Sequence, residues 1–447
     1  MEKKAIIVGA GLVGSLWAVF LAKAGYKVVI YERRSDIRKA EISAGKSINL
    51  ALSTRGWTAL KAAGVDKLVE DIAIPMYGRI MHDLDGNETE QAYGKDGQAI
   101  YSISRGDLNA RMMDIAEDAG NAKIHYNQKC IDVDLEAGII TLESYETGEV
   151  TTDQGDVVFA CDGAFSAVRY NGLQKLDRFD YMQDYIDDGY RELLLPANED
   201  GSYKMDKNAL HIWPRGRFML IALANDDGSF TCTLFMPFEG ENSFEALKTD
   251  ADVDKFFKET FPDFYEMFPG LIDSWHGHPL SSLAIIRCYP WTKGKIALMG
   301  DAAHATVPFY GQGMNSGFED CSVMNDLMHK HNEDWEKVFE EYQDLRKPDG
   351  DAVQDLSVHN YYVMRDFVGD PTFLLQKKIE KRFSDLYPDK WMPLYSQVSF
   401  SNIRYSEAWA TGMKQDEIMK TVMDRPDIND VWDSKEIEVN ILNLLEA

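Results

Sequence analysis

The sequence predicts an α/β protein built from a discontinuous domain of parallel strands and helices, an antiparallel sheet domain and a helical C-terminal segment. Residues 4–32 read as an apolar run, a glycine turn, a helical stretch and a second apolar run. Between about residues 180 and 285, aromatic and β-branched runs are separated by turn residues. After residue 334 the apolar spacing is helical with few turn signals. These periods are typical of a βαβ unit, of antiparallel strands and of packed helices, in that order.

Size and charge narrow the classes of function. The chain has 447 residues, which at about 100–200 residues per domain gives two or three domains. Hydrophobic residues make up 45% and charged residues 27%, which is an ordinary globular composition. The 47 basic and 74 acidic residues give a net charge of −27, which repels nucleic acid and anionic membranes. An anionic ligand therefore needs basic groups at its own site.

The cysteines and the apolar segments predict a cytoplasmic protein. The five cysteines are scattered and form no C-x-x-C pair, so we predict buried thiols in a reducing compartment, with no disulfides and no metal site. The apolar run near the N-terminus, Ala5–Val8, is too short for a signal peptide. No stretch approaches the roughly 18 apolar residues of a membrane helix.

The first domain begins with the clearest local pattern. A strand at Ala5–Val8, a helix at Leu12–Ala24 and a strand at Lys27–Glu32 form a βαβ unit. Residues 155–163 and 294–300 read as further buried strands, and a helix is expected from about residue 313 to 330. We therefore assign residues 1–75, 100–175 and 286–330 to this domain.

The second domain is predicted from short strand-like runs. They include His211–Trp213, Phe218–Ala222 and Phe230–Phe235, and a hairpin is expected around Asp85-Gly86. We assign residues 76–99 and 176–285 to this antiparallel domain, and residues 331–447 to the helical segment.

The glycine turn carries the first chemical signal. Gly9, Gly11 and Gly14 fit G-x-G-x-x-G between a strand and a helix, where backbone N–H groups face a pyrophosphate. Glu32 ends the second strand, where its carboxylate can accept hydrogen bonds from ribose hydroxyls. This pattern indicates a Rossmann-type dinucleotide site but does not separate FAD from NAD. The alternative is a tight strand–helix turn with a solvated glutamate.

A distant segment favours a flavin. Residues 299–321 read MGDAAHATVPFYGQGMNSGFEDC, a strand end and a glycine-rich loop that leads into a helix. Asp301 could bind a ribityl hydroxyl, and N–H groups around Gly313–Asn315 could face the flavin edge that carries negative charge when reduced. The alternative is an ordinary β-loop-α joint with His304 as a packed core residue. A third segment, Asp156–Arg169, places an Asp-Gly pair at a strand end and is weak by itself.

Together, these segments resemble the single-component flavoprotein aromatic hydroxylases, in which the three motifs occur in this order. Several further blocks are similar to the kynurenine 3-monooxygenase family over roughly residues 4–410. They are GKSINLALSTRG (45–56), PMYGRIMH (75–82), YSISRGDLN (101–109), LHIWPRG (210–216), FTCTLFMPFE (230–239), PFYGQGMNSGFEDC (308–321) and PLYSQVSFSNIRY (393–405).

The resemblance implies two sets of site residues. The positions at which FAD is bound correspond to Gly9, Gly11, Val13, Gly14, Tyr31, Glu32, Arg33, Arg34, Ala51, Arg105, Cys130, Asp301, Met314 and Asn315. Arg105 would offset the acidic background, and Cys130 would contact FAD through its backbone. The positions that hold L-kynurenine correspond to Arg79, Tyr93, Asn360 and Tyr395. Phe309 and Tyr310 would lie beside the aromatic ring and orient it, and no residue is expected to be catalytic in the usual sense.

The resemblance also implies the reaction. FAD reduced by NADPH would react with O₂ to give a C4a-hydroperoxide, which hydroxylates L-kynurenine at the 3-position to give 3-hydroxy-L-kynurenine. The aniline nitrogen of the substrate supplies electron density, so a protein base is not obligatory. NADPH would dock transiently, since the sequence shows no second dinucleotide fold.

The residues themselves leave the geometry of the substrate site open. A two-residue turn at Asp85-Gly86 would pair Arg79 with Ala92 and send Tyr93 to the opposite face, whereas a three-residue loop would place Arg79 across from Tyr93. We favour the longer loop. Asn360 and Met364 share one helix face, and ordinary packing would explain Asn360 or Tyr395 taken alone.

Two other functions compete with this interpretation. One is a flavin hydroxylase for another aromatic acid, such as a hydroxybenzoate, and the other is a flavin-binding redox sensor without hydroxylase turnover. Mitochondrial members of the family carry an additional C-terminal hydrophobic anchor, whereas this chain ends KEIEVNILNLLEA. We therefore expect a soluble, bacterial-like form with no membrane anchor. A homodimer is one of the oligomeric states that the sequence leaves open.

Overall fold

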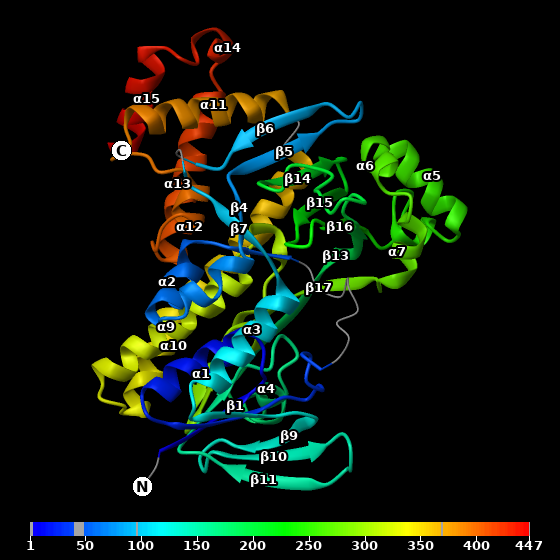
Figure 1. The fold of residues 1–447 in the computed structure, drawn as a ribbon. Helices are drawn as coiled ribbons and strands as arrows, with labels where there is room; N and C mark the ends of the chain where they lie inside the picture. The colour runs from blue at the N-terminus through cyan, green and yellow to red at the C-terminus, as the bar shows by residue number, and fades with distance from the viewer. Residues whose placement is uncertain (1–2, 40–48, 95–96, 368–369, 447) are drawn as a thin grey trace.

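The computed structural model describes residues 3–39, 49–94, 97–367 and 370–446 (Figure 1). Its N-terminal part is built on a six-stranded sheet in the order β18-β19-β12-β1-β2-β8. The strands are β1 (Lys4–Val8), β2 (Lys27–Tyr31), β8 (Ala122–His125), β12 (Val157–Ala160), β18 (Thr292–Lys293) and β19 (Ile296–Leu298). All neighbours are parallel except β18 and β19. The predicted βαβ unit and the buried strand at 294–300 are confirmed.

Helices cover this sheet. Helix α1 is buried from Gly14 to Ala22, because its sequence is apolar almost all round, and it packs against α3 and α9. The long helix α10 lies against α9. These helices are α1 (Leu12–Lys23), α3 (Arg105–Asp118), α9 (Gly313–Lys330) and α10 (Trp335–Tyr362), and the bounds of α9 match the sequence prediction.

A seven-stranded sheet in the order β17-β13-β16-β15-β14-β5-β6 forms the middle of the molecule. Its strands are β5 (Gly78–His82), β6 (Glu88–Ala92), β13 (Asp180–Leu195), β14 (Ala209–Pro214), β15 (Met219–Ala224), β16 (Phe230–Pro237) and β17 (Ser281–Tyr289). Neighbours are antiparallel as expected, except that β14 and β5 pair in parallel.

Three helices follow β16 where the sequence interpretation expected only antiparallel strands. They are α5 (Asp250–Thr260), α6 (Pro262–Met267) and α7 (Leu271–Gly277), and they lie beside the sheet in Figure 1. A capping box between Thr249 and Asp252 starts α5, and Val253 and Phe257, four residues apart, bury one face of it. The aromatic residues of this region therefore belong to helices as well as to strands.

The two faces of the seven-stranded sheet have different roles. Leu220, Ala222 and Ala224 of β15 pack in one cluster with apolar side chains of α5, α6 and α7. The alternate residues point the other way, and Met219 packs with Phe309 and with residues at the end of α10. The second face therefore looks toward the loop that precedes α9.

Smaller elements connect these layers. A sheet of β3 (Asn49–Leu52), β7 (Ile100–Ser104) and β4 (Ile74–Met76) lies next to helix α2 (Thr54–Ala62), and β9 (Gln128–Asp134), β10 (Ile139–Ser144) and β11 (Val150–Gln154) form a separate sheet. Two short helices are α4 (Ala167–Asn171) and α8 (Asp301–His304). The C-terminal helices are α11 (Pro371–Leu386), α12 (Leu394–Ser399), α13 (Tyr405–Met423), α14 (Ile428–Val431) and α15 (Lys435–Glu446). Over the residues that the structure describes, no helix is both long enough and apolar enough to span a bilayer.

Candidate active site

The three predicted nucleotide segments meet at one edge of the parallel sheet. Strands β19, β12 and β1 are neighbours, and their last residues lie in register: Leu298 with Ala160, and Ala160 with Val8. The loops that follow them begin at Gly9, at Cys161 and at Met299. Ligands of open α/β sheets bind outside the carboxyl ends of the strands, so this edge is the place for a dinucleotide.

The three motif glycines serve different purposes. Gly9 has φ of +102°, and a Cβ there would lie 2.5 Å from the Cys161 carbonyl oxygen. A Cβ on Gly14 would lie 2.1 Å from the Gly9 carbonyl oxygen. Gly11 has an ordinary extended backbone, and no protein atom lies within 4 Å of the position of its Cβ. The fold itself therefore needs glycine at positions 9 and 14, whereas position 11 faces open space at the N-terminus of α1, where a phosphate fits.

Glu32 holds the glycine loop in place. It is buried, and its Oε2 accepts the N–H of Ala10 at 2.9 Å. Its Oε1 accepts the backbone N–H of Arg34 at 3.0 Å and Arg34 Nε at 3.1 Å. The carboxylate keeps further lone pairs, which could accept ribose hydroxyls, and this contact stays a prediction.

The second and third segments close around α1. A Cβ on Gly300 would lie 2.9 Å from Cγ2 of Val13, so the turn before Asp301 approaches α1 closely. Asp162 Oδ2 accepts the N–H of Ala167 at 2.6 Å, while its Oδ1 is buried and has no partner among the described residues. This open acceptor and the open space at Gly11 both fit a bound dinucleotide.

The start of α9 forms the remaining wall of the predicted dinucleotide site. Asn315 is fully buried, and its Nδ2 donates to the carbonyl oxygens of Ala51 and Gly311, both at 2.8 Å. Its Oδ1 accepts the N–H of Ser53 at 2.9 Å. The side chain thus joins β3 to the glycine-rich loop. Backbone N–H groups, including that of the buried Met314, remain for an anionic flavin edge.

The other predicted cofactor residues differ in how far their side chains are available to a ligand. The Tyr31 hydroxyl donates to Asp153 at 2.8 Å, and its ring stacks on His125, while its carbonyl oxygen accepts the N–H of Gly9. Cys130 is buried, and burial raises the pKa of its thiol to about 12. Arg33 and Arg105 are exposed, the latter at the first residue of α3.

A second group of predicted residues gathers on the seven-stranded sheet. The Arg79 guanidinium carbon lies 5.2 Å from the centre of the Tyr93 ring and 5.0 Å from that of Tyr395. Tyr395 stacks on Tyr93 at 5.2 Å and on Tyr310 at 5.7 Å, measured between ring centres. Residues from β5, from the end of the hairpin, from α12 and from the glycine-rich loop thus surround one arginine.

The hairpin register differs from both sequence alternatives. Arg79 pairs with Gln91, so the loop spans the five residues 83–87, and the three-residue loop that we favoured is wrong. Asp83 holds this loop by accepting the N–H groups of Asp85 and Asn87 on Oδ1, at 2.9 and 2.8 Å. The observed register differs from the favoured one by two residues, an even number, so Arg79 and Tyr93 still share a face.

The arginine is poised for an anion. Its Nε and the Tyr93 hydroxyl are both buried, and neither makes a well-aligned hydrogen bond with the described residues, although the hydroxyl lies close enough to the Arg79 guanidinium and to Tyr395 to interact with both. Buried polar groups without a well-aligned partner are uncommon and indicate a ligand that completes them. Burial also raises the pKa of Tyr93 and of Tyr310, so both phenols stay protonated and can donate.

Asn360 lies at the other end of this face. Its Nδ2 donates to the carbonyl oxygen of Phe309 at 2.7 Å and contacts Met364 Sδ at 3.3 Å, so the shared helix face is confirmed. The Phe309 ring packs on Phe235 and Tyr361, with ring centres 4.8 and 4.3 Å apart.

Sequence reasoning missed the apolar floor between these groups. Leu210 and Ile221 are partly buried and touch both the Phe309 cluster and the Tyr93 cluster. Leu210 is the β14 residue paired with Arg79. The alternation of side-chain direction along β14 and β15 was the sequence signal that could have identified this floor. The neighbouring Ala51 packs against the Tyr93 cluster and accepts from Asn315, which links the two halves of the site.

The far end of β5 is fixed by a buried histidine pair. His82 Nε2 and His211 Nδ1 lie 2.9 Å apart, and His82 Nδ1 lies 2.9 Å from Asp263 Oδ2. His211 Nε2 faces the Asp206 carbonyl oxygen at 2.8 Å, so it carries the proton and His211 Nδ1 accepts. Burial lowers the pKa of His211 to about 4.

This histidine makes stability depend on pH. An unfolded His211 takes up a proton below about pH 6.5, whereas the folded one does so near pH 4, so stability falls as the pH drops through this window. Acidification from pH 7 to 5 should lower the free energy of unfolding by about 2 kcal/mol through this residue. Urea unfolding of wild type and His211→Gln at both pH values measures it. Equal pH dependence in the two proteins would contradict the effect.

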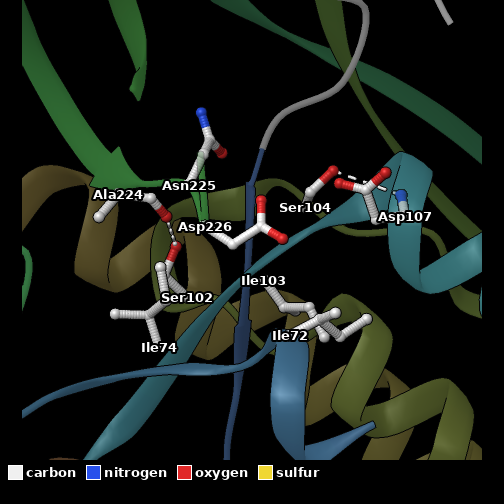
Figure 2. A pocket seen from close by; sticks show the side chains of 9 residues that line it. All are labelled: Ile72, Ile74, Ser102, Ile103, Ser104, Asp107, Ala224, Asn225 and Asp226. Carbon is white, nitrogen blue, oxygen red and sulfur yellow. Dashed lines mark hydrogen bonds between the residues drawn. The ribbon is translucent and has the colours of Figure 1, made fainter. Parts of the chain in front are cut away.

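A small pocket elsewhere in the molecule lacks the basic character of the Arg79 cluster. Figure 2 shows it between the start of α3 and the turn after β15. Its lining carries the carboxylates Asp107 and Asp226 and no basic side chain. An anion would therefore meet no opposite charge in this pocket, in contrast to the surroundings of Arg79.

Comparison with known proteins agrees with this geometry. The family model described as "FAD binding domain" matches residues 2–194 and 276–357, so the molecule is an FAD-binding flavoprotein. The solved structure of 2-methyl-3-hydroxypyridine-5-carboxylic acid oxygenase shares the fold, with a TM-score of 0.67 at 18% identity over 83% of this chain and 95% of that one. A tetracycline destructase superposes with a TM-score of 0.61 at 20% identity over 91% and 99%.

Curated relatives identify the family more narrowly within the FAD-binding flavoproteins. A kynurenine 3-monooxygenase of Flavobacterium johnsoniae is 51% identical over 99% of both chains. The enzymes of that name from Christiangramia forsetii and Sus scrofa are 51% and 44% identical, over 100% and 93% of this chain and 99% and 88% of theirs. The chain belongs to the kynurenine 3-monooxygenase family.

Proposed function

We propose that this enzyme hydroxylates L-kynurenine at the 3-position. One molecule each of L-kynurenine, NADPH and O₂, with a proton, gives 3-hydroxy-L-kynurenine, NADP⁺ and water. One observation supports this most strongly: an arginine that forms no ion pair with the described residues lies against two tyrosine rings, with a third stacked on one of them, in a chain that is half identical to enzymes named for this substrate. The buried free thiols support a cytoplasmic location.

Arg79 binds the substrate carboxylate in this proposal. Its planar fork can donate to both carboxylate oxygens, and the Tyr93 and Tyr395 hydroxyls can donate to the same group. Such a contact would give the Tyr93 hydroxyl a well-aligned hydrogen bond, which the described residues do not supply. It also supplies the local positive charge that a protein of net charge −27 needs for an anion.

The aromatic end of the substrate lies beside Phe309 and Tyr310, over the apolar floor of Leu210 and Ile221. Asn360 donates its Nδ2 to Phe309, so its amide oxygen is the atom that it would offer to the substrate. Tyr93 and Tyr310 have raised pKa values and do not act as bases near neutral pH. A phenol substrate needs deprotonation and kynurenine does not, which favours kynurenine over hydroxybenzoates.

The nucleotide segments hold FAD. Gly11 and the start of α1 would hold the pyrophosphate, Glu32 the ribose, Asp301 the ribityl chain, and the N–H groups of Met314 and Asn315 the flavin edge. When bound, FAD would supply the redox chemistry that links NADPH to O₂. The protein orients the ring, excludes water and stabilises negative charge on the flavin.

The proposal is tested with purified holoenzyme. NADPH oxidation is measured with L-kynurenine, 4-hydroxybenzoate or salicylate, and the product is identified by mass spectrometry. We expect rapid oxidation and 3-hydroxykynurenine with the first compound only. Turnover of a hydroxybenzoate would favour the other hydroxylase class, and flavin without turnover of any of the three would favour a redox sensor.

Tyr93→Phe tests the phenolic hydrogen bond. We expect L-kynurenine binding to weaken by about 1 kcal/mol, roughly fivefold in KM, because one hydrogen bond to the carboxylate is lost while the ring remains. Steady-state kinetics measure the change. An unaltered KM would mean that the ring only packs against Tyr395.

A further inference from the structure

A buried ionic network lies behind the active site, between α2, α9 and α10. Arg55 donates to Glu319 Oε1 at 2.7 Å, and Arg346 donates to Glu319 Oε2 at 2.6 Å. Arg346 Nε also donates to Asp320 Oδ1 at 2.7 Å. The side chains of Arg55, Arg346 and Asp320 are at most 2% exposed. None of these residues was predicted to bind FAD or substrate.

Stability alone does not account for such a network. Three arginines, Arg55, Arg346 and Arg404, face three carboxylates, those of Glu319, Asp320 and Asp349. Asp320 Oδ2 also lies 2.6 Å from Nε2 of the buried His304. Removing ions from water costs about as much as their pairing returns, so apolar residues of similar volume would serve equally well. What the charged groups add is a defined geometry.

Arg55 uses this geometry to hold the segment that carries Tyr395. Its Nε donates to the Val398 carbonyl oxygen at 3.1 Å, and its Nη2 donates to the Ile403 carbonyl oxygen. Val398 lies in the last turn of α12, where carbonyl oxygens have no partner within the helix. The Arg55 guanidinium also lies 3.9 Å from the centre of the Tyr405 ring, at the start of α13. One side chain thus fixes both sides of the turn between α12 and α13.

Tyr395 lies one turn before Val398 on the same short helix. Tyr395 and Val398 also pack with Tyr310 and with apolar residues of α10 and α13. The hydrogen bond from Arg55 to Val398 adds a directional contact from α2 to this apolar packing, on the helix that carries the Tyr395 ring to Arg79 and Tyr93.

We propose that Arg55, supported by Glu319, is a positioning residue for substrate binding, which acts by placing Tyr395 against Arg79. The inference rests on the proposed role of Tyr395 in holding L-kynurenine. It assigns to Arg55 a function in the substrate site, although Arg55 itself contacts neither the Arg79 cluster nor any predicted cofactor residue in the described interactions.

A double-mutant cycle in the FAD-loaded enzyme tests it. Arg55→Met, Tyr395→Ala and the double variant are titrated with L-kynurenine, and the dissociation constant is read from the change in flavin absorbance. We expect each single variant to bind tenfold or more weakly, and the double variant to bind no more weakly than Tyr395→Ala. The Arg55→Met variant should raise KM tenfold or more while kcat changes less than twofold.

Two further variants separate positioning from general damage. Arg382→Met removes an arginine of α11, which pairs with Glu438 of α15 at 2.8 Å and not with the turn between α12 and α13, and this variant should bind like wild type. Arg55→Lys keeps the charge but has all its donors on one nitrogen, whereas Arg55 reaches Val398, Glu319 and Ile403 from three different nitrogens. We therefore expect a threefold or greater loss. It also serves as the test variant should Arg55→Met fail to fold.

Each outcome decides between the alternatives. Wild-type affinity in Arg55→Met, full rescue by Arg55→Lys, or additive losses in the double variant would overturn the positioning role and leave the proposed function intact. Wild-type affinity in Tyr395→Ala would overturn the assignment of Tyr395 itself, and the present inference with it.

Discussion

Replacing Arg79 with alanine should weaken L-kynurenine binding by about 2–4 kcal/mol, which raises KM roughly thirtyfold to several hundredfold. The substrate carboxylate loses a charge-assisted, two-pronged contact, and the protein offers it no other cation in the described cluster. The FAD content should not change, because the predicted nucleotide residues come from other segments. Steady-state kinetics and the absorbance of bound flavin measure the two quantities.

A second arginine on the same sheet provides the matched control. Arg191 lies 4.2 Å from the centre of the Trp275 ring and donates to the Trp275 carbonyl oxygen, on a strand away from β5. Arg191→Ala removes the same atoms and should leave KM unchanged. A KM within twofold of wild type in Arg79→Ala would remove this residue from the substrate site.

Gly11→Ala should cost the enzyme most of its FAD. No protein atom lies within 4 Å of the added Cβ and the backbone is in the extended region, so the chain itself accepts alanine. The methyl group instead occupies the space where a pyrophosphate approaches the backbone of α1. We expect a weakening of FAD binding by about 2 kcal/mol or more, comparable to losing a charged hydrogen bond. Flavin released on gel filtration, and the dissociation constant on reconstitution, give the size of the loss.

Gly277→Ala is the control for this substitution. Gly277 also has open space around its Cβ position and no positive φ, and it ends α7 on the far side of the seven-stranded sheet. This variant should retain FAD. A Gly11→Ala protein that purifies fully loaded would contradict the phosphate assignment.

The parts of the fold that could be predicted are those that local sequence controls. The βαβ unit, the strand before Asp301 and the bounds of α9 follow from apolar periods and glycine positions within about 20 residues. The capping box at Thr249–Asp252 was an equally local signal for α5, and it was overlooked among the aromatic residues around it.

The hairpin shows why register was harder to predict. The favoured loop of three residues was chosen from Asp85-Gly86 alone, whereas the loop is closed by Asp83, whose carboxylate accepts N–H groups two and four residues further on. The favoured register placed Arg79 and Tyr93 on the same face of the hairpin. Side chains alternate between the two faces with a period of two, so a register error of two residues leaves both side chains on that face.

Contacts between distant segments could not be predicted from the sequence. Arg55 and Ile403 are 348 residues apart, and nothing in either neighbourhood marks the other. The same holds for Asn315, whose side chain joins Ala51 and Gly311. Three tyrosines around one arginine likewise form only when hairpin, glycine-rich loop and α12 are folded together.

A crystal structure of the holoenzyme soaked with L-kynurenine tests the central claim most directly. We predict density for the substrate carboxylate within hydrogen-bond distance of the Arg79 guanidinium and the Tyr93 hydroxyl, with the flavin ring between this cluster and the start of α9. A carboxylate bound elsewhere, with Arg79 left without an anion, would contradict the account.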